Sequence, residues 1–366
     1  MKNLFVIGNF RSGTSLLGTA LNAHPNLMVA YEPYLLFFKQ CRNKFLAEVL
    51  GKPCDPDYPI GLLTLSAVDK DGCLERIFEE VRFSADELAK LVEILRPYLV
   101  HENNICKDSK PARLGKFLDG LKPGSAGEVL QQLMERFLLS EQDGIAKGKD
   151  LRMVGIKEVF CEEYMPAFLN SPTLGGAKVV HIIRDLRAVV ASRNYGKYYE
   201  TAGNKYPISF FIRSWKQTVE MCRRCQNIPG YMMIRYEDMV THPEETFQNI
   251  CDTLEIPFAK ELTDFSSYTN SKGGQWKPNT SFERAKDITS TAVSRWRKIL
   301  TPADIEVLEH FCRDEMAFMG YQPVTENFDL ERIANYNEDE ALINPWLRNY
   351  GFGYMGKEGV GKSVKR

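Results

Sequence analysis

The feature that most constrains the fold is a short apolar run that ends in a glycine-rich turn. Residues 4–7 are apolar and lead into Gly8-Asn9-Phe10-Arg11-Ser12-Gly13-Thr14-Ser15-Leu16-Leu17. This order predicts a β-strand, a tight turn and a helix whose first N–H groups face an anion. The segment therefore predicts a P-loop-like phosphate site, built on a parallel sheet, near the start of the sequence.

The turn differs from the loop of ATP-hydrolysing proteins at one position. Thr14 and Ser15 follow Gly13, where those proteins have a lysine that reaches the β- and γ-phosphates. Arg11 is the cation that this loop offers instead. A literal match to the lysine-containing pattern occurs at residues 356–363, but only three residues follow it, too few for a helix. We interpret that match as accidental.

Three further apolar runs alternate with helical patterns, at residues 153–156, 179–183 and 231–236. Their length and composition are typical of buried parallel strands. Residues from about 41 to 150 contain no convincing strand and many helix formers, which predicts an α-helical insertion or cap. The chain is thus expected to be an α/β protein, with a P-loop-like parallel sheet flanked by helices in one domain over residues 1–325. Residues 326–366 are expected to be a partly flexible C-terminal extension.

Two helices have recognisable starts. Ser84-Ala85-Asp86-Glu87 is a capping box and predicts a helix that ends before Pro97. Thr301-Pro302-Ala303-Asp304 predicts another helix, which stops near Gly320.

Composition excludes several classes of protein. Lys and Arg number 47 against 48 Asp and Glu, a balance that argues against binding nucleic acid by bulk charge. The longest apolar runs are about five or six residues, too short to span a bilayer. Nine cysteines at irregular spacing are typical of a reduced intracellular protein, and the lone Cys222–Cys225 pair has no second pair for zinc. We expect no metal.

The apolar run at residues 179–183 leads into a second anion-binding pattern. Arg184 stands at its carboxyl end, the edge at which ligands of open α/β sheets bind, and Ser192 follows about two helical turns later. Taken alone, Arg184 and Asp185 could equally form a helix cap and a salt bridge.

Together the two patterns resemble the nucleotide-binding signatures of sulfotransferases, which use 3′-phosphoadenosine 5′-phosphosulfate as donor. The resemblance implies that Arg184 and Ser192 hold the 3′-phosphate. It implies that the 5′-phosphosulfate is held by the first motif, namely Arg11, Ser12, Gly13, Thr14, Ser15 and Leu16. Leu186 stands where many members of the family have proline, a difference that should affect only the start of the helix.

Further segments resemble the carbohydrate 6-O-sulfotransferase and tyrosylprotein sulfotransferase branches. They are Asn22-Ala23-His24-Pro25-Asn26, Tyr31-Glu32-Pro33, Gly155-Ile156-Lys157-Glu158-Val159, Ile234-Arg235-Tyr236-Glu237-Asp238 and Ala292-Val293-Ser294-Arg295-Trp296. The resemblance, over roughly residues 1–40 and 150–323, implies that Glu32 is the general base and Lys157 a second cation on the transferring group. It places Tyr236 near the nucleotide and Arg295 in a segment that closes over it.

These roles make chemical sense. Charge builds on the oxygen of the leaving phosphate during sulfuryl transfer, so a fixed cation such as Arg11 is useful there. The acceptor hydroxyl must lose a proton, and Glu32 is expected to take it. Glu32 before Pro33 could instead simply end a strand, and His101 is the alternative base, since other branches use histidine.

The sequence therefore predicts a sulfotransferase that acts on an acceptor hydroxyl, with a carbohydrate favoured and a lipid, peptide tyrosine or secondary metabolite open. Two alternatives remain: a P-loop small-molecule kinase, and a non-catalytic glycan- or nucleotide-binding protein of the same fold. No nucleic-acid partner is expected. We expect a cytoplasmic protein if the chain is the complete gene product, and the luminal domain of a Golgi enzyme if it has been trimmed.

Overall fold

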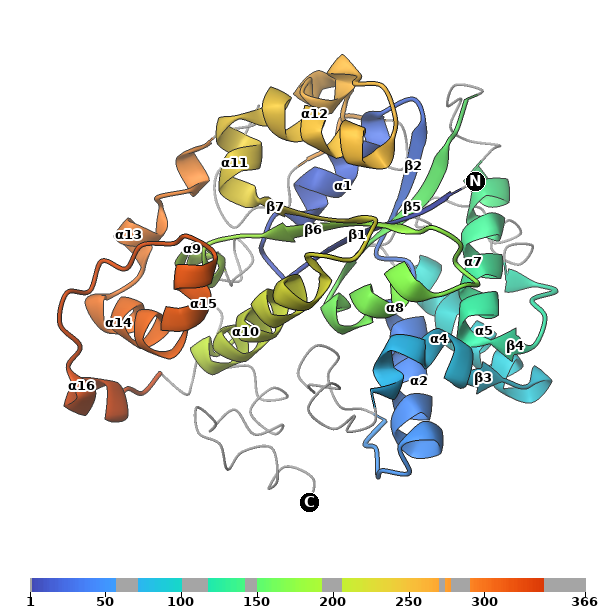
Figure 1. Ribbon diagram of the computed structural model, residues 1–366, viewed down its shortest axis with the longest axis horizontal. Coiled ribbons are helices and arrows are strands. Elements are labelled where there is room, and N and C mark those ends of the chain that lie inside the picture. Colours follow the sequence, from blue (N-terminus) through green and yellow to red (C-terminus); the bar gives the residue numbers. More distant parts are fainter. Residues whose placement is uncertain are drawn as a thin grey trace.

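A five-stranded parallel sheet forms the centre of the molecule (Figure 1). The computed structural model describes residues 2–56, 72–100, 118–141, 150–192, 206–269, 274–277 and 290–338. In spatial order the strands are β2 (Leu27–Tyr31), β5 (Met153–Val159), β1 (Lys2–Gly8), β6 (Lys178–Ile183) and β7 (Tyr231–Arg235). The α/β fold class is confirmed, and four of these strands lie where the sequence predicted strands. The strands β1 and β5 are longer than predicted, and β7 ends one residue earlier, because Tyr236 already belongs to the following helix.

The strand that sequence analysis missed is β2, at the edge of the sheet. Its five residues pair with β5, and Tyr31 stands opposite Lys157 in the register. So short an apolar run directly after a helix does not reveal its type by periodicity.

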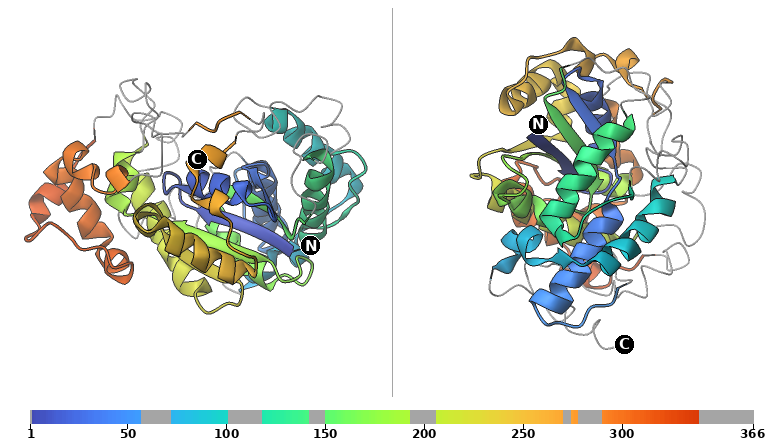
Figure 2. Two further views of the ribbon diagram at one scale, coloured as in Figure 1. Left: turned by 90° about the horizontal axis from the view of Figure 1, so that it is seen from above. Right: turned by 90° about the vertical axis from the view of Figure 1, so that its right-hand side faces the viewer.

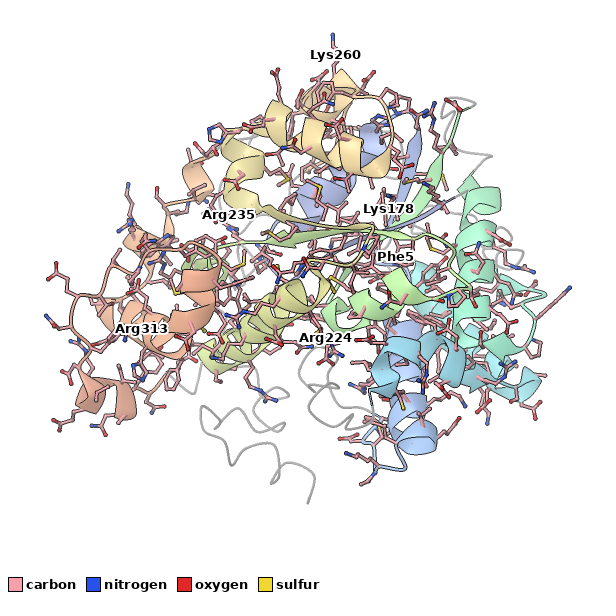
Figure 3. The ribbon with its side chains drawn as sticks, viewed as in Figure 1. Phe5, Lys178, Arg224, Arg235, Lys260 and Arg313 are labelled. Carbon is pink, nitrogen blue, oxygen red and sulfur yellow. The ribbon has the colours of Figure 1, made fainter. Side chains whose placement is uncertain are left out.

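Helices cover both faces of the sheet, and the side chains of β1 alternate between them. Leu4 and Val6 pack with α1 (Thr14–Ala23), α11 (Tyr236–Thr241) and α12 (Pro243–Leu254). Phe5 points to the other face (Figure 3). It stacks on Phe168 of α8 (Met165–Asn170) at a ring-centroid distance of 3.9 Å. Because both faces are buried, the strands read as continuous apolar runs.

The segment between β2 and β5 is mainly helical, as expected for an insertion. Its elements are α2 (Leu35–Lys44), a π-helix (Phe45–Val49), a 3₁₀ turn (Cys73–Arg76), α4 (Ile77–Glu80), α5 (Ala85–Val100), α7 (Ala126–Glu141) and the antiparallel ribbon of β3 (Arg82–Phe83) and β4 (Gly124–Ser125). The ribbon corrects the expectation that this segment holds no strand; two-residue strands leave no alternating pattern in a sequence.

The capping box at the start of α5 is confirmed, but the end of this helix was predicted wrongly. Ser84 and Glu87 exchange their side-chain-to-backbone hydrogen bonds at 2.8 and 3.3 Å. The helix then runs through Pro97 to residue 100. Leu91 and Leu95 are buried in the core, so packing of the apolar face outweighs the one backbone hydrogen bond that proline removes.

The C-terminal third adds a group of helices at the far end of the sheet from the insertion (Figures 1 and 2). Its elements are a 3₁₀ turn (Ser290–Ala292), α13 (Trp296–Ile299), α14 (Pro302–Phe311), α15 (Arg313–Phe318) and α16 (Leu330–Ala334). Of these, α13, α14 and α15 pack against α9 (Leu186–Ala191) or α10 (Ile208–Cys225), which come from the middle of the chain. Further 3₁₀ turns lie at Glu162–Tyr164, Lys260–Leu262 and Phe265–Ser267.

One sequence expectation for this end needs correction. The Thr301 capping box is present, but the helix breaks at Cys312 and continues as α15 rather than running unbroken toward Gly320. The region after residue 326 contains α16, which Arg332 ties to Glu306 through a hydrogen bond of 2.6 Å. Within the described ranges, none of the helices is long and apolar enough to cross a membrane.

Candidate active site

The residues predicted from sequence lie along one edge of the sheet. Glu32 directly follows β2, Lys157 lies near the end of β5, and Arg11 lies in the loop after β1. Arg184 follows β6 and Tyr236 follows β7. Since the strands are parallel, all of these positions are at their carboxyl ends, where ligands of α/β proteins bind.

The glycine-rich loop has the backbone shape of an anion cradle. Gly13 adopts a left-handed conformation with φ 96°, and a Cβ atom there would collide with the ring of Tyr236. The Ser12 N–H donates to the Asn9 carbonyl at 3.0 Å, and α1 begins at Thr14. Glycine is therefore required at position 13 to bring the helix N-terminus and Tyr236 together.

Arg184 is a buried cation whose charge no carboxylate balances among the described residues. It is 7% exposed, and its Nη atoms donate to the carbonyls of Arg11 at 3.1 Å and Ala292 at 2.9 Å. Its guanidinium lies 4.3 Å from the centroid of the Tyr236 ring, and its buried Nε has no hydrogen-bond partner there. A buried cation in this state is stabilised by an anion.

Three further residues that the sequence predicted to bind the donor lie at the ends of helices or within α1. Ser192, 7% exposed, caps the C-terminus of α9, so it stands at the end of that helix and not inside it. Arg295 caps the N-terminus of α13, three residues after the Ala292 carbonyl that Arg184 contacts. Leu16 is partly buried in α1 and packs against the sheet.

Lys157 and Glu32 form a partly enclosed ion pair at this edge. The Lys157 ammonium, 1% exposed, donates to Glu32 Oε1, and the Glu32 N–H donates to the Lys157 carbonyl at 2.7 Å. Burial alone would lower the pKa of Lys157, but the neighbouring Glu32 carboxylate raises it above its ordinary value. Gly18 of α1 leaves room for the lysine, since a Cβ there would lie 3.0 Å from Lys157 Cγ.

Sequence analysis gave no role to Glu158, which supports the turn that carries Glu32. Its Oε1 accepts a hydrogen bond of 2.6 Å from the Tyr34 N–H, and its Oε2 is buried without a partner among the described residues. Burial raises the pKa of Glu158 well above its usual range. Burial therefore favours the neutral form of this carboxyl, which lies on the face of β5 opposite Lys157. The sequence signal that could have revealed Glu158 is the presence of two adjacent charged residues, Lys157 and Glu158, inside an otherwise apolar strand.

A second unassigned residue, Arg187, joins the donor pattern to the C-terminal helices. It pairs with Asp185 at 2.7 Å and with Glu309 at 2.5 Å, and it lies 4.2 Å over the Trp296 ring. All three charged side chains are buried. Glu309 is 122 residues further along the chain, so sequence could not reveal this network.

Other predicted features lie elsewhere. His101 and residues 356–363 fall outside the described residues. Cys222 and Cys225 are buried on α10, and the described part of the chain contains no cluster of three or more metal-binding side chains.

Comparison with known proteins relates this chain to one enzyme family. Residues 165–320 match the family model of the sulfotransferase domain. Carbohydrate sulfotransferase 2 of Homo sapiens is 23% identical over 90% of this chain and 67% of its own length. Protein-tyrosine sulfotransferase of Drosophila melanogaster is 26% identical over 40% of this chain and 30% of its own. The solved sulfotransferase domain from the curacin biosynthetic pathway covers 88% of this chain and 99% of its own, at 15% identity and a TM-score of 0.47.

Proposed function

The chain is a sulfotransferase, and we propose that it transfers the sulfuryl group of 3′-phosphoadenosine 5′-phosphosulfate to a hydroxyl of a carbohydrate. One observation carries this proposal. Arg184 is buried beside the glycine-rich cradle without a carboxylate partner among the described residues, while a second buried cation, Lys157, lies at the same sheet edge. Two anionic groups of one donor suit this arrangement.

The two ends of the donor would bind to different elements. Arg184 and Ser192 would hold the 3′-phosphate, with Arg295 brought near by the Ala292 contact. The N-terminal N–H groups of α1 and the Ser12, Thr14 and Ser15 hydroxyls would hold the 5′-phosphosulfate. The nucleotide would thus lie across the carboxyl ends of β1 and β6.

The reaction is a displacement at sulfur. The acceptor oxygen forms a bond to sulfur, the bond between sulfur and the bridging oxygen breaks, and the electron pair stays on the departing phosphate. Arg11 would stabilise that oxygen, and Glu32 would take the proton of the acceptor hydroxyl. An ammonium has three N–H donors, so Lys157 can contact Glu32 and the sulfonate together. The chain's own side chains therefore account for each charge that develops.

A carbohydrate acceptor agrees with the relatives and with an aromatic surface beside Arg11. Phe10 lies 5.8 Å from Phe160 and 5.3 Å from Tyr206 between ring centroids, and all three rings are partly exposed. The Arg11 guanidinium lies 5.6 Å from the Phe10 ring. Aromatic faces at the reacting centre suit the C–H face of a sugar ring.

Two measurements test the proposal. Thermal unfolding with 3′-phosphoadenosine 5′-phosphate should show stabilisation of about 2.7 kcal/mol at a hundredfold excess over Kd, with none from ATP. Mass spectrometry of saccharides incubated with labelled donor should detect a sulfated product. Preference for ATP would instead indicate a kinase, and donor binding without transfer to any hydroxyl would indicate a binding protein.

A further inference from the structure

Tyr31, the last residue of β2, contacts both parts of the proposed site. Its hydroxyl is hydrogen-bonded to Ser15 Oγ in the cradle, and its ring centroid lies 4.3 Å from Lys157 Nζ. We propose that Tyr31 has two separable tasks: its hydroxyl orients Ser15 toward the donor phosphate, and its ring holds the Lys157 ammonium beside Glu32. This inference rests on the proposed function.

The fold explains how one side chain reaches both groups. Tyr31 is paired with Lys157 across β2 and β5, so their side chains leave the sheet on the same face. That face is covered by α1, where Gly18 adjoins the Lys157 side chain. Ser15 is three residues before Gly18, hence on the same side of the helix. Tyr31 therefore lies between the cradle and the lysine.

The hydrogen bond between the Tyr31 and Ser15 hydroxyls decides where the hydrogen of the Ser15 hydroxyl points. A serine hydroxyl has one hydrogen and two lone pairs. With a phosphate in the cradle, the Ser15 hydrogen points to the anion, and the Tyr31 O–H donates to Ser15 Oγ. Each bond in such a chain polarises the next, so Tyr31 strengthens the contact between Ser15 and phosphate without touching the donor.

The ring contact serves the lysine. Lys157 is 1% exposed, so water cannot stabilise its ammonium. The face of an aromatic ring attracts a cation, and this attraction is greatest where the cation is desolvated. Glu32 and the Tyr31 ring are two of its neighbours and come from consecutive residues, so together they define where the ammonium lies relative to the reacting sulfur.

Two substitutions separate the tasks. Tyr31→Phe removes the hydroxyl and keeps the ring; the Kd of 3′-phosphoadenosine 5′-phosphate should rise about two- to tenfold, with kcat at saturating donor within about twofold of wild type. Tyr31→Leu removes both; the Kd should rise similarly, and kcat should fall roughly tenfold. Tyr31→Met gives the same comparison if the leucine variant melts below the assay temperature.

Tyr164→Phe is the matched control. Tyr164 is buried, and its hydroxyl donates to the Phe38 carbonyl at 2.8 Å, in the core on the face of the sheet opposite α1, away from both Ser15 and Lys157. Losing this bond should lower the melting temperature but leave Kd and kcat unchanged.

The outcomes are distinguishable. An unchanged Kd in Tyr31→Phe overturns the hydroxyl task, and equal kcat in the phenylalanine and leucine variants overturns the ring task. If Tyr31 only supported the fold, keeping its ring in Tyr31→Phe would not be expected to restore the kcat that is lost in Tyr31→Leu. If the wild-type protein neither binds the bisphosphate nor transfers sulfuryl groups, the proposed function itself fails.

Discussion

The proposed site has a donor half around Arg184 and a transfer half around Lys157. Each half buries a cation at the carboxyl edge of the sheet, but the charge of that cation is balanced differently in the two halves. Arg184 contacts two carbonyls and the Tyr236 ring, with no carboxylate among the described residues. Lys157 already has the Glu32 carboxylate. We therefore expect an anionic ligand to complete the donor half, whereas Lys157 in the transfer half has a carboxylate partner before any substrate binds.

The two halves are also supported from opposite ends of the molecule. Arg187 links the donor half to Glu309 and Trp296 in the C-terminal helices. The transfer half is supported from the insertion, where Tyr34 binds Glu158 and the Leu133 carbonyl. We therefore expect changes in the donor half to affect affinity, and changes in the transfer half to affect turnover.

The largest effect is expected in the transfer half. Glu32→Gln should lower kcat by ~10²–10⁴ while the donor still binds, because the amide cannot accept the proton of the acceptor hydroxyl. Single-turnover kinetics at saturating donor measure this. Glu255→Gln is the control: Glu32 (φ 49°) and Glu255 (φ 60°) both have positive φ and both pair with lysine, but Glu255 lies at the surface. Near wild-type kcat in Glu32→Gln would move the base elsewhere, with His101 the next residue to change.

The next effect concerns the support of the donor half. Arg187→Ala should lower the free energy of unfolding by about 3–5 kcal/mol, because Asp185 and Glu309 would stay buried without their cation. Denaturant unfolding measures the loss. Arg223→Ala, which removes a surface arginine that pairs with Glu220 and lies over Phe318, should change it little. Equal losses in the two variants would show that the buried network does not support this half.

Arg184 itself gives the direct test of the comparison. Arg184→Ala should raise the Kd of 3′-phosphoadenosine 5′-phosphate about ten- to a hundredfold, the value of a charge-assisted bond to phosphate. At saturating donor, kcat should change less than Kd. Isothermal titration and steady-state kinetics measure the two quantities, with the exposed Arg152→Ala as control. An unchanged Kd would remove Arg184 from the donor site.

Sequence alone predicted the donor half more completely than the transfer half. Arg184 follows a strand of six residues with an evident apolar pattern, so its place at the sheet edge could be inferred. The sequence pattern did not reveal β2, and without that strand Tyr31 cannot be placed between Ser15 and Lys157. Resemblance, not periodicity, pointed to Glu32.

Side-chain partners distant in sequence account for the rest. Lys157 and Glu158 are adjacent in the chain but lie on opposite faces of β5, and which face meets Tyr34 depends on the insertion. Arg187 could be recognised as part of a helix start, but not as the partner of Glu309. Local patterns fix where strands and turns begin, while buried ion pairs depend on the packing of whole elements.

The smallest predicted effect tests whether the transfer half contains a neutral carboxyl. Because the pKa of Glu158 is raised in the folded protein, its contribution to stability is complete below the ordinary value of 4.5 and is lost as the pH rises. Glu158→Gln keeps an oxygen for the Tyr34 N–H and cannot ionise. The variant should therefore gain stability relative to wild type as the pH rises above the ordinary pKa of glutamate, as measured by urea unfolding, and should retain its turnover.

Glu128 provides the opposite case for the same measurement. It also accepts one backbone N–H at 2.6 Å, from Ser125, but it is exposed, and that hydrogen bond lowers its pKa. Stability from Glu128 is thus present above its ordinary pKa and lost in acid, so Glu128→Gln should lose a little stability at neutral pH. Opposite pH slopes for the two variants would show that burial, and not the shared hydrogen bond, keeps Glu158 neutral. Parallel slopes would mean that Glu158 is ionised, so that the transfer half carries an unbalanced negative charge beside Glu32.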